Sequence, residues 1–87
     1  MLNKRNSMDI IAEILKVAHD GAKKTHIVYK ANLNFKVLEE YLEKMIDSGL
    51  VTILKEKRNL IKTTEKGVTY LKNYRGFMNY VESTIIV

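Results

Sequence analysis

The fold is decided by residues 31–49, ANLNFKVLEEYLEKMIDSG, in which a tight turn runs into an amphipathic helix. Asn34 is expected to cap this helix, because its side-chain oxygen can accept from the free backbone N–H groups of the first turn. The apolar residues that recur at helical spacing are Leu38, Tyr41, Leu42, Met45 and Ile46. Gly49 follows them, at the position where a left-handed residue commonly ends a helix. Taken alone, the stretch fits an ordinary amphipathic helix equally well.

A first helix is predicted near the start of the sequence. Ser7 is expected to cap it, Asp9 lies in its first turn, where a negative charge complements the helix dipole, and Gly21 is expected to end it. Its apolar stripe consists of Ile10, Ile11, Ile14, Leu15 and Ala18. The periodicity therefore predicts a helix of about three turns.

A short second helix is predicted over residues 26–31, with Thr25 as its cap. Asn32 and Leu33 then form a tight turn into the third helix, and we interpret Asn32 as a turn residue. Two helices joined by a few residues, the second of them capped by Asn34, are typical of a helix-turn-helix.

Beyond the third helix the pattern changes to that of a β-hairpin. Residues 50–54 and 60–63 are rich in β-branched side chains, and residues 55–59, KEKRN, form a charged tip that ends on a turn former. Thr64 is expected to cap a last helix, with Glu65 in its first turn. The sequence therefore predicts a mostly α chain with a β-hairpin (α+β), a winged helix-turn-helix of order α-α-α-β-β-α.

The last helix carries two apolar stripes. One consists of Val68, Leu71, Tyr74 or Arg75, and Met78, and the other of Tyr70, Tyr74, Phe77 and Val81. The second alternates steps of four and three, as a short coiled-coil seam does, and a chain of this size leaves it nothing to cover. We therefore expect a homodimer whose interface contains Tyr70, Tyr74, Phe77, Met78 and Val81. The alternative is a monomer with half-exposed tyrosines.

The length of 87 residues fits one domain with a single core. We expect a basic arm at 1–6, a winged-helix core at 7–66, and a dimerisation helix and tail at 67–87. No apolar run approaches the roughly 18 residues that span a bilayer, and the N-terminus lacks the apolar core of a signal peptide. The absence of cysteine excludes a disulfide scaffold. We therefore expect a cytoplasmic, nucleoid-associated protein that contacts no membrane.

The charge of the chain is uneven along its length. The net charge of +5 favours a polyanionic partner, most often nucleic acid. Residues 1–33 and 50–66 each carry a net +3, whereas residues 34–49 carry two lysines against four acids, a net −2. Only the first turn of the third helix is therefore expected to approach phosphates, consistent with N-terminal docking of such a helix into the major groove.

The candidate DNA-binding residues are basic or polar and fall at helix starts and on the hairpin. They are Lys23, Lys24, Thr25, Lys30, Asn34, Lys36, Lys55, Lys57, Arg58 and Lys62. Helix starts can hold phosphates on backbone N–H groups, and a hairpin tip can reach phosphates or a minor groove. The alternative for the hairpin is a solvated turn whose lysines prevent edge pairing. For Asn34, capping and base contact both remain open.

Neither a catalytic site nor a metal site nor a cofactor is expected. His19 and His26 fall on different elements without a third ligand at metal spacing or a nearby nucleophile. The sequence also contains no glycine-rich phosphate loop. These observations argue against an enzyme.

Several segments carry a family resemblance. They are IIAEIL at 10–15, GAKKT at 21–25, YKANLN at 29–34, Leu42, SGL at 48–50 and TEKG at 64–67. Together they resemble the small archaeal winged helix-turn-helix proteins that include the ten-kilodalton chromatin-associated DNA-binding proteins of thermophilic archaea. The resemblance covers roughly residues 7–80.

This resemblance implies a homodimer joined by an antiparallel coiled coil of the last helices, with duplex DNA bound by the helix-turn-helix and the wing. In this chain those roles would fall on the helix that starts at Asn34, on the wing around Lys57 and Arg58, and on the seam from Tyr70 to Val81. The last helix is expected to be short for this family, so the dimer can be smaller or differently arranged.

We therefore expect a homodimeric double-stranded DNA-binding protein, either sequence-tolerant or sequence-specific, acting as a transcriptional regulator or a nucleoid-associated protein. One alternative is a protein-interaction module on the same scaffold without DNA binding, because the acidic face of the third helix suits a basic partner. The other alternative is an RNA-binding module.

Overall fold

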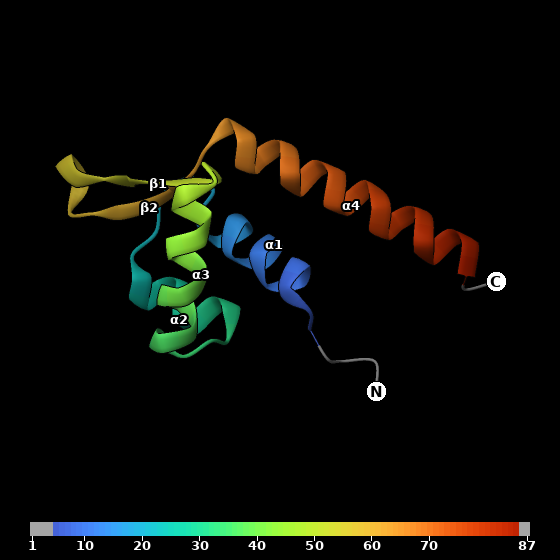
Figure 1. The fold of residues 1–87 in the computed structure, drawn as a ribbon, viewed down its shortest axis with the longest axis horizontal. Coiled ribbons are helices and arrows are strands. Elements are labelled where there is room, and N and C mark those ends of the chain that lie inside the picture. The colour runs from blue at the N-terminus through green and yellow to red at the C-terminus, as the bar shows by residue number, and fades with distance from the viewer. Residues whose placement is uncertain (1–4, 86–87) are drawn as a thin grey trace.

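The computed structural model describes residues 5–85, and its element order is the predicted α-α-α-β-β-α (Figure 1). The elements are α1 (Ser7–Val17), α2 (Lys24–Ala31), α3 (Phe35–Asp47), β1 (Val51–Leu54), a 3₁₀ turn (Lys55–Lys57), β2 (Leu60–Thr63) and α4 (Glu65–Ile85). Most of the predicted arm and the last two residues of the predicted tail lie outside the described residues.

One apolar core lies between α1, α2, α3 and the hairpin. The largest side chains that are fully buried in it are Ile14, Leu15, Ile27, Leu38, Leu42, Met45, Val51 and Ile61. The predicted stripes supply most of these residues, although Tyr41 is half-buried and Ile46 is exposed. Burying one such side chain contributes about 1.5–3 kcal/mol, whereas isolated helices of this length are marginal in water. The short helices therefore depend on this shared core.

The start of α1 differs from the prediction by one residue. Asn6, not Ser7, is the N-cap: its side-chain oxygen accepts from the backbone N–H of Asp9 at 2.8 Å, and the Asp9 carboxylate accepts from the backbone N–H of Asn6 at 3.1 Å. This reciprocal pair is a capping box, which satisfies two free donors at once. The prediction for Gly21 is also wrong, because α1 ends at Val17 and Gly21 (φ +103°) lies in the loop beyond it.

The helix-turn-helix turn follows the prediction, except at the start of α2. Thr25 lies inside α2, and the N-cap is Lys23, whose side chain makes no capping hydrogen bond. Asn32 adopts the left-handed conformation (φ 56°) that ends α2, which confirms its role as a turn residue. Asn34 caps α3 by accepting from the backbone N–H of Val37 at 2.8 Å, as predicted.

The hairpin pairs β1 with β2 in antiparallel register from Val51↔Thr63 to Leu54↔Leu60. A further pairing was not predicted: Ala22 and Ile61 exchange backbone hydrogen bonds of 2.9 and 2.8 Å on the other edge of β2. This bridge fixes the α1–α2 loop to the hairpin, and it leaves the outer edge of β1 without a strand partner among the described residues.

A crowded joint connects α4 to the rest of the chain. The Thr63 hydroxyl donates to the Leu15 carbonyl at 2.8 Å, and the Thr64 hydroxyl accepts from the Gly67 N–H at 3.1 Å, which makes Thr64 the predicted cap. A Cβ at Gly67 would collide with the Leu50 carbonyl oxygen and lie 2.6 Å from Cγ2 of Thr63. A glycine therefore allows α4 to start directly against the hairpin.

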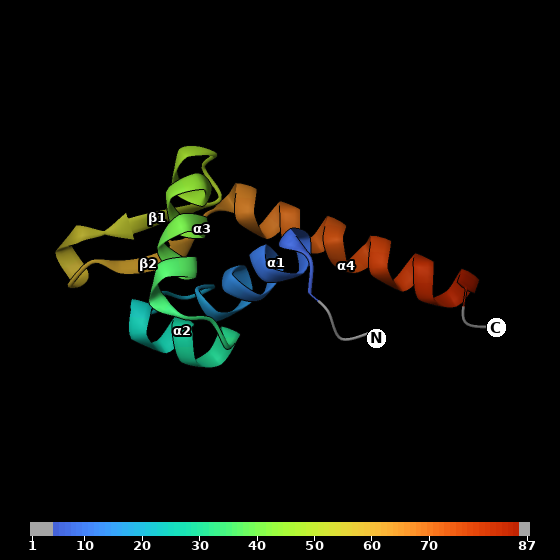
Figure 2. The same cartoon turned by 60° about the horizontal axis from the view of Figure 1, so that its bottom comes forward.

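Beyond this joint, α4 runs along α1, and its C-terminal half projects past the head formed by the other elements (Figures 1 and 2). The helix has 21 residues, which corresponds to about 31 Å at 1.5 Å per residue. The molecule is accordingly elongated, with extents of 48 × 26 × 19 Å. Within residues 5–85, no helix is both long enough and apolar enough to cross a membrane.

We expect Gly67→Ala to lower the free energy of unfolding by about 1–3 kcal/mol, because the added methyl group overpacks the joint. The matched control is Gly76→Ala on α4, where a Cβ meets no atom within 4 Å. That control should raise stability by up to about 1 kcal/mol through helix propensity. Urea denaturation of both variants measures the difference, and equal stability of the two would contradict the crowded joint.

Candidate nucleic-acid interface

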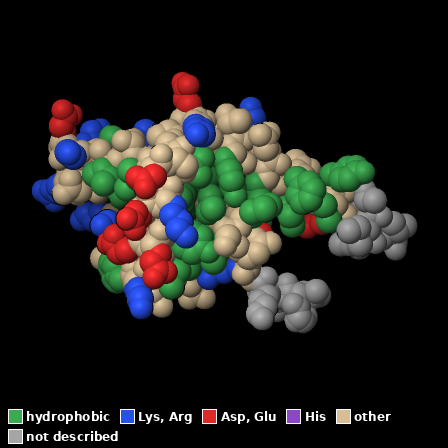
Figure 3. Space-filling view, viewed as in Figure 1, with side chains coloured by type: hydrophobic (Ala, Val, Ile, Leu, Met, Phe, Trp, Pro, Cys, Tyr) green, Lys and Arg blue, Asp and Glu red, His purple; other side chains and the backbone are tan. Residues whose placement is uncertain are grey.

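The tip of the wing (β1, the 3₁₀ turn and β2) is an exposed basic surface. Lys55, Lys57 and Arg58 are all exposed there, with Glu56 as the acid in the same turn. Arg58 and Asn59 both adopt left-handed conformations, φ 57° and 60°, which close the chain after the 3₁₀ turn. Figure 3 shows Lys and Arg side chains gathered at the hairpin end of the molecule. The tip can therefore approach a phosphate without first breaking an internal contact.

Two other predicted DNA-binding lysines are engaged within the chain. The Lys62 ammonium donates to the His19 carbonyl at 3.1 Å, and the Lys24 ammonium contacts the Glu39 carboxylate at 2.8 Å. Both lysines are half-buried. Contact with a phosphate would replace these interactions, so the structure gives Lys24 and Lys62 a weaker case than the wing tip.

The remaining predicted residues lie at the ends of α2 and at the start of α3. Lys23 and Thr25 are exposed at the start of α2, where no side chain caps the backbone N–H groups. Such free N–H groups can hold a phosphate. Lys30 and Lys36 are exposed near the turn between α2 and α3. Asn34 uses its side-chain oxygen to cap α3, so a structural role accounts for that atom.

Arg5 lies in the predicted basic arm, but it serves the fold. Its guanidinium donates to the carbonyls of Ala31 and Asn32, at 2.6 and 3.0 Å, at the C-terminal end of α2. A cation there satisfies free carbonyls and complements the helix dipole. The partners are 26 and 27 residues apart in sequence, so no local pattern could have revealed them.

The outer face of α3 is acidic, as the charge distribution predicted. Glu39, Glu40, Glu43 and Asp47 are exposed on it. Acidic side chains gather over α3 in Figure 3. Phosphates would be repelled along most of this helix, which leaves only its first turn, with Lys36, near a duplex.

The predicted dimer interface divides into two parts. Tyr70 and Tyr74 are half-buried against the protein's own core, so the expectation that this stripe has nothing to cover is wrong for them. Phe77 is 55% exposed, whereas Met78 and Val81 are half-buried. Tyr80, which lies outside both predicted stripes, is 66% exposed. The exposed aromatic side chains of α4, Phe77 and Tyr80, therefore lie on its projecting half.

A hydrogen bond from the Tyr74 hydroxyl to the Asp9 carboxylate links α4 to the start of α1. This bond, together with the bond from the Asn6 backbone N–H, lowers the pKa of Asp9 below its ordinary value of 3.8. The same hydrogen bond, aided by burial, raises the pKa of Tyr74 to about 12. Burial, and secondarily the charge of Asp9, also raises the pKa of Tyr70. The Tyr70 hydroxyl oxygen is buried and has no hydrogen-bond partner among the described residues.

These shifts predict a pH-dependent contribution to stability. A lowered Asp9 pKa contributes stability that is present above 3.8 and is lost as the pH falls through the shifted value. A raised Tyr74 pKa contributes stability that is present below 10.0 and is lost as the pH rises through about 12. Tyr74→Phe should therefore be less stable than the parent at pH 7, with a difference that closes on strong acidification.

Thermal unfolding across acidic pH measures this effect. Tyr29→Phe is the matched control, because Tyr29 is 81% exposed on α2 and should leave stability unchanged at every pH. A Tyr74→Phe difference that stays constant as Asp9 becomes protonated would contradict the link between α1 and α4.

Comparisons with known proteins agree with this geometry. The chain matches a winged helix-turn-helix family over residues 4–82. It is 32% identical over 77 residues to an uncharacterized protein of Methanocaldococcus jannaschii, covering 87% of this chain and 79% of that protein. The crystal structure of Sso10a-2, a DNA-binding protein from Sulfolobus solfataricus, superposes with a TM-score of 0.81 at 27% identity, covering 92% of this chain and 85% of that one. The likeness therefore includes the hairpin and most of α4.

Proposed function

Because this chain belongs to the winged helix-turn-helix family, we propose that it binds double-stranded DNA as a homodimer, through the wing and the start of α2. The family and the DNA-binding structural neighbour indicate a non-enzymatic protein. One observation carries the proposal: the exposed basic tip, Lys55, Lys57 and Arg58, lies on a scaffold that matches a DNA-binding protein over 92% of the chain.

The proposed contacts are mainly to phosphates. Cationic side chains that neutralise phosphates release counterions, and this term supplies most sequence-independent affinity. Base edges would have to be read from α3, whose exposed face carries Glu39, Glu40, Glu43 and Asp47. Only Lys36 in its first turn favours an approach to the duplex. The charge distribution therefore supports sequence-tolerant binding, as in a nucleoid-associated protein, over base-specific regulation.

Fluorescence anisotropy with labelled random-sequence duplex DNA, titrated across salt concentrations, tests this proposal. We expect a linear fall of log K with log salt, with a slope of about −0.9 for each neutralised phosphate. Lys57→Ala/Arg58→Ala should weaken binding to all sequences alike and make the slope shallower by about 1–2.

The matched control is Lys72→Ala/Arg75→Ala, which removes the same charge from exposed positions on α4. It should keep most of the salt slope. Equal losses in the two double variants would remove the wing from the mechanism and leave only a net-charge effect.

We further propose that the projecting half of α4 forms the dimer seam. Phe77 and the half-buried Val81 lie on one stripe there, and an apolar stripe on a projecting helix is stabilised when a second copy covers it. The steps of four and three that connect Tyr74, Phe77 and Val81 suit packing against another helix. Two heads would then be held at a fixed separation on one duplex.

Phe77→Glu should convert a dimer into a monomer, because it places a carboxylate in the seam. Asn79→Glu adds the same charge at an exposed position away from this stripe and should leave the dimer intact. Light scattering coupled to size-exclusion chromatography gives the masses. A parent protein that is monomeric, or a Phe77→Glu variant that is dimeric, would refute the seam.

A further inference from the structure

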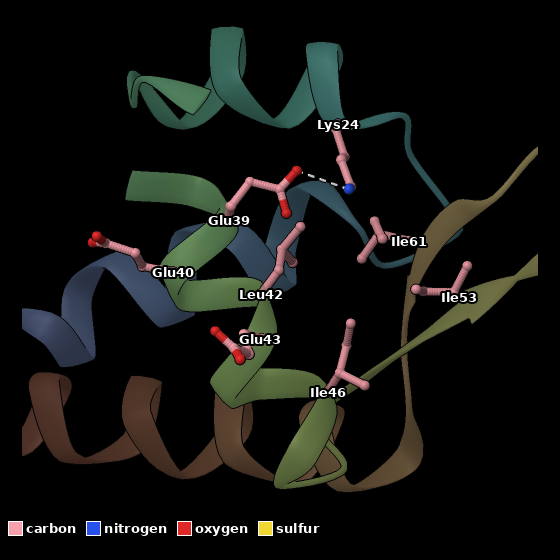
Figure 4. A pocket seen from close by; sticks show the side chains of 8 residues that line it. All are labelled: Lys24, Glu39, Glu40, Leu42, Glu43, Ile46, Ile53 and Ile61. Atoms are coloured by element: carbon pink, nitrogen blue, oxygen red, sulfur yellow. Dashed lines mark hydrogen bonds and ion pairs between the residues drawn. The ribbon is translucent and has the colours of Figure 1, made fainter. Parts of the chain in front are cut away.

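A groove of about 360 Å³ lies between α3 and the wing, and the DNA-binding proposal does not use it (Figure 4). Its apolar lining comes from three elements: Leu42 and Ile46 on α3, Ile53 on β1 and Ile61 on β2. Figure 4 shows these four side chains converging on the hollow. Leu42 and Ile61 also belong to the buried core, whereas Ile46 is 37% exposed. An aliphatic group that enters the groove would therefore contact buried core residues at its base and the partly exposed Ile46 at its opening.

The polar lining of the groove is negative. It contains the carboxylates of Glu39, Glu40 and Glu43 against the single ammonium of Lys24. The Lys24–Glu39 ion pair, at 2.8 Å, lies at the end nearest α2 and compensates one carboxylate. Glu40 and Glu43 are exposed on α3, and in Figure 4 they extend from the helix away from the hairpin. Two carboxylates are thus available to a ligand that lies across α3.

We propose that this α3–wing groove binds a basic peptide segment of another protein, with one aliphatic side chain in the hollow and flanking Lys or Arg side chains on Glu40 and Glu43. Charge complementarity selects this occupant. The carboxylates oppose nucleic acid and acidic peptides, and the apolar floor offers no donor to a phosphate. An apolar centre surrounded by a polar rim is the usual arrangement of a protein interface.

A second copy of this chain fits the groove less well. The described basic segments do not combine an accessible aliphatic side chain with cations: the wing tip at 55–59, KEKRN, contains no aliphatic residue, and Ile27 and Val28, near the lysines of α2, are buried and half-buried. The occupant must combine both features, so we assign the groove to a different protein. The charged residues of the wing tip and those of the groove are different, so the two ligands can be tested with separate variants.

A direct test uses a short fluorescent peptide with a central leucine between pairs of lysines, added to the full chain in anisotropy measurements. We expect saturable binding that weakens about fivefold or more in Glu40→Gln/Glu43→Gln, the loss expected for two exposed ion pairs. Ile46→Ser should weaken binding as well, because it removes part of the apolar lining while changing no charge. A peptide with serine in place of leucine should bind more weakly than the leucine peptide.

The matched control is Glu65→Gln/Glu82→Gln, which removes two carboxylates from exposed positions on α4. It should bind the peptide as the parent does. No binding of the leucine peptide, equal binding of the serine peptide, or equal loss in both glutamine variants would overturn the proposal, because each would leave only general charge attraction.

Failure of the groove can be told apart from failure of the DNA interface. Lys57→Ala/Arg58→Ala should retain peptide binding, and Glu40→Gln/Glu43→Gln should bind random-sequence duplex DNA at least as tightly as the parent. If Glu40→Gln/Glu43→Gln loses DNA binding together with peptide binding, the groove is part of the DNA surface and the proposal is wrong, whereas the DNA-binding proposal would stand.

Discussion

The close approach of α4 to the hairpin at Gly67 is the constraint on which the other features depend. Gly67 lies against the Leu50 carbonyl, where no side chain fits, and the hydroxyl of the neighbouring Thr63 donates to the Leu15 carbonyl. The base of the wing, the end of α1 and the start of α4 therefore meet at one point. Because α4 is anchored there, its far half projects from the head in a fixed direction, held farther along by the bond between Tyr74 and Asp9.

Basic and acidic side chains occupy different surfaces of the molecule. Basic side chains occupy the wing tip and the start of α2, and acidic side chains occupy the exposed face of α3. Lys24 lies between the two regions and contacts Glu39. In this arrangement the acidic face of α3 disfavours a polyanion, while the basic wing tip favours one. The same separation leaves the α3–wing groove accessible to a ligand of opposite charge.

Local features of the sequence predicted most of the fold. The apolar periodicities placed every helix, and Asn32, Asn34 and Thr64 have the turn and capping roles that their residue types favour. Ser7 was predicted as the cap of α1, but Asn6 has that role. The spacing of Asn6 and Asp9, which allows a capping box, was the signal that could have decided between them.

The remaining differences arise from contacts between distant parts of the chain. Arg5 binds the end of α2, Lys62 binds the His19 carbonyl, and Tyr74 binds Asp9, across separations of 26, 43 and 65 residues. The periodicity of apolar residues in the sequence does not reveal such pairs. These long-range contacts matter for the site, because the sequence does not distinguish an exposed lysine or arginine from one that is held by an internal hydrogen bond. Among the predicted DNA-binding residues, the structure therefore favours those of the wing tip.

The most direct test of the account is an NMR titration of the isotope-labelled protein with random-sequence duplex DNA. Backbone amide shifts should be largest at residues 55–58 of the wing tip and at the first turn of α2, with little change along the outer face of α3 beyond Lys36. That result would establish binding through phosphates by the wing. The largest shifts at Glu39, Glu40 and Glu43 would contradict it, because the duplex would then lie against the acidic helix.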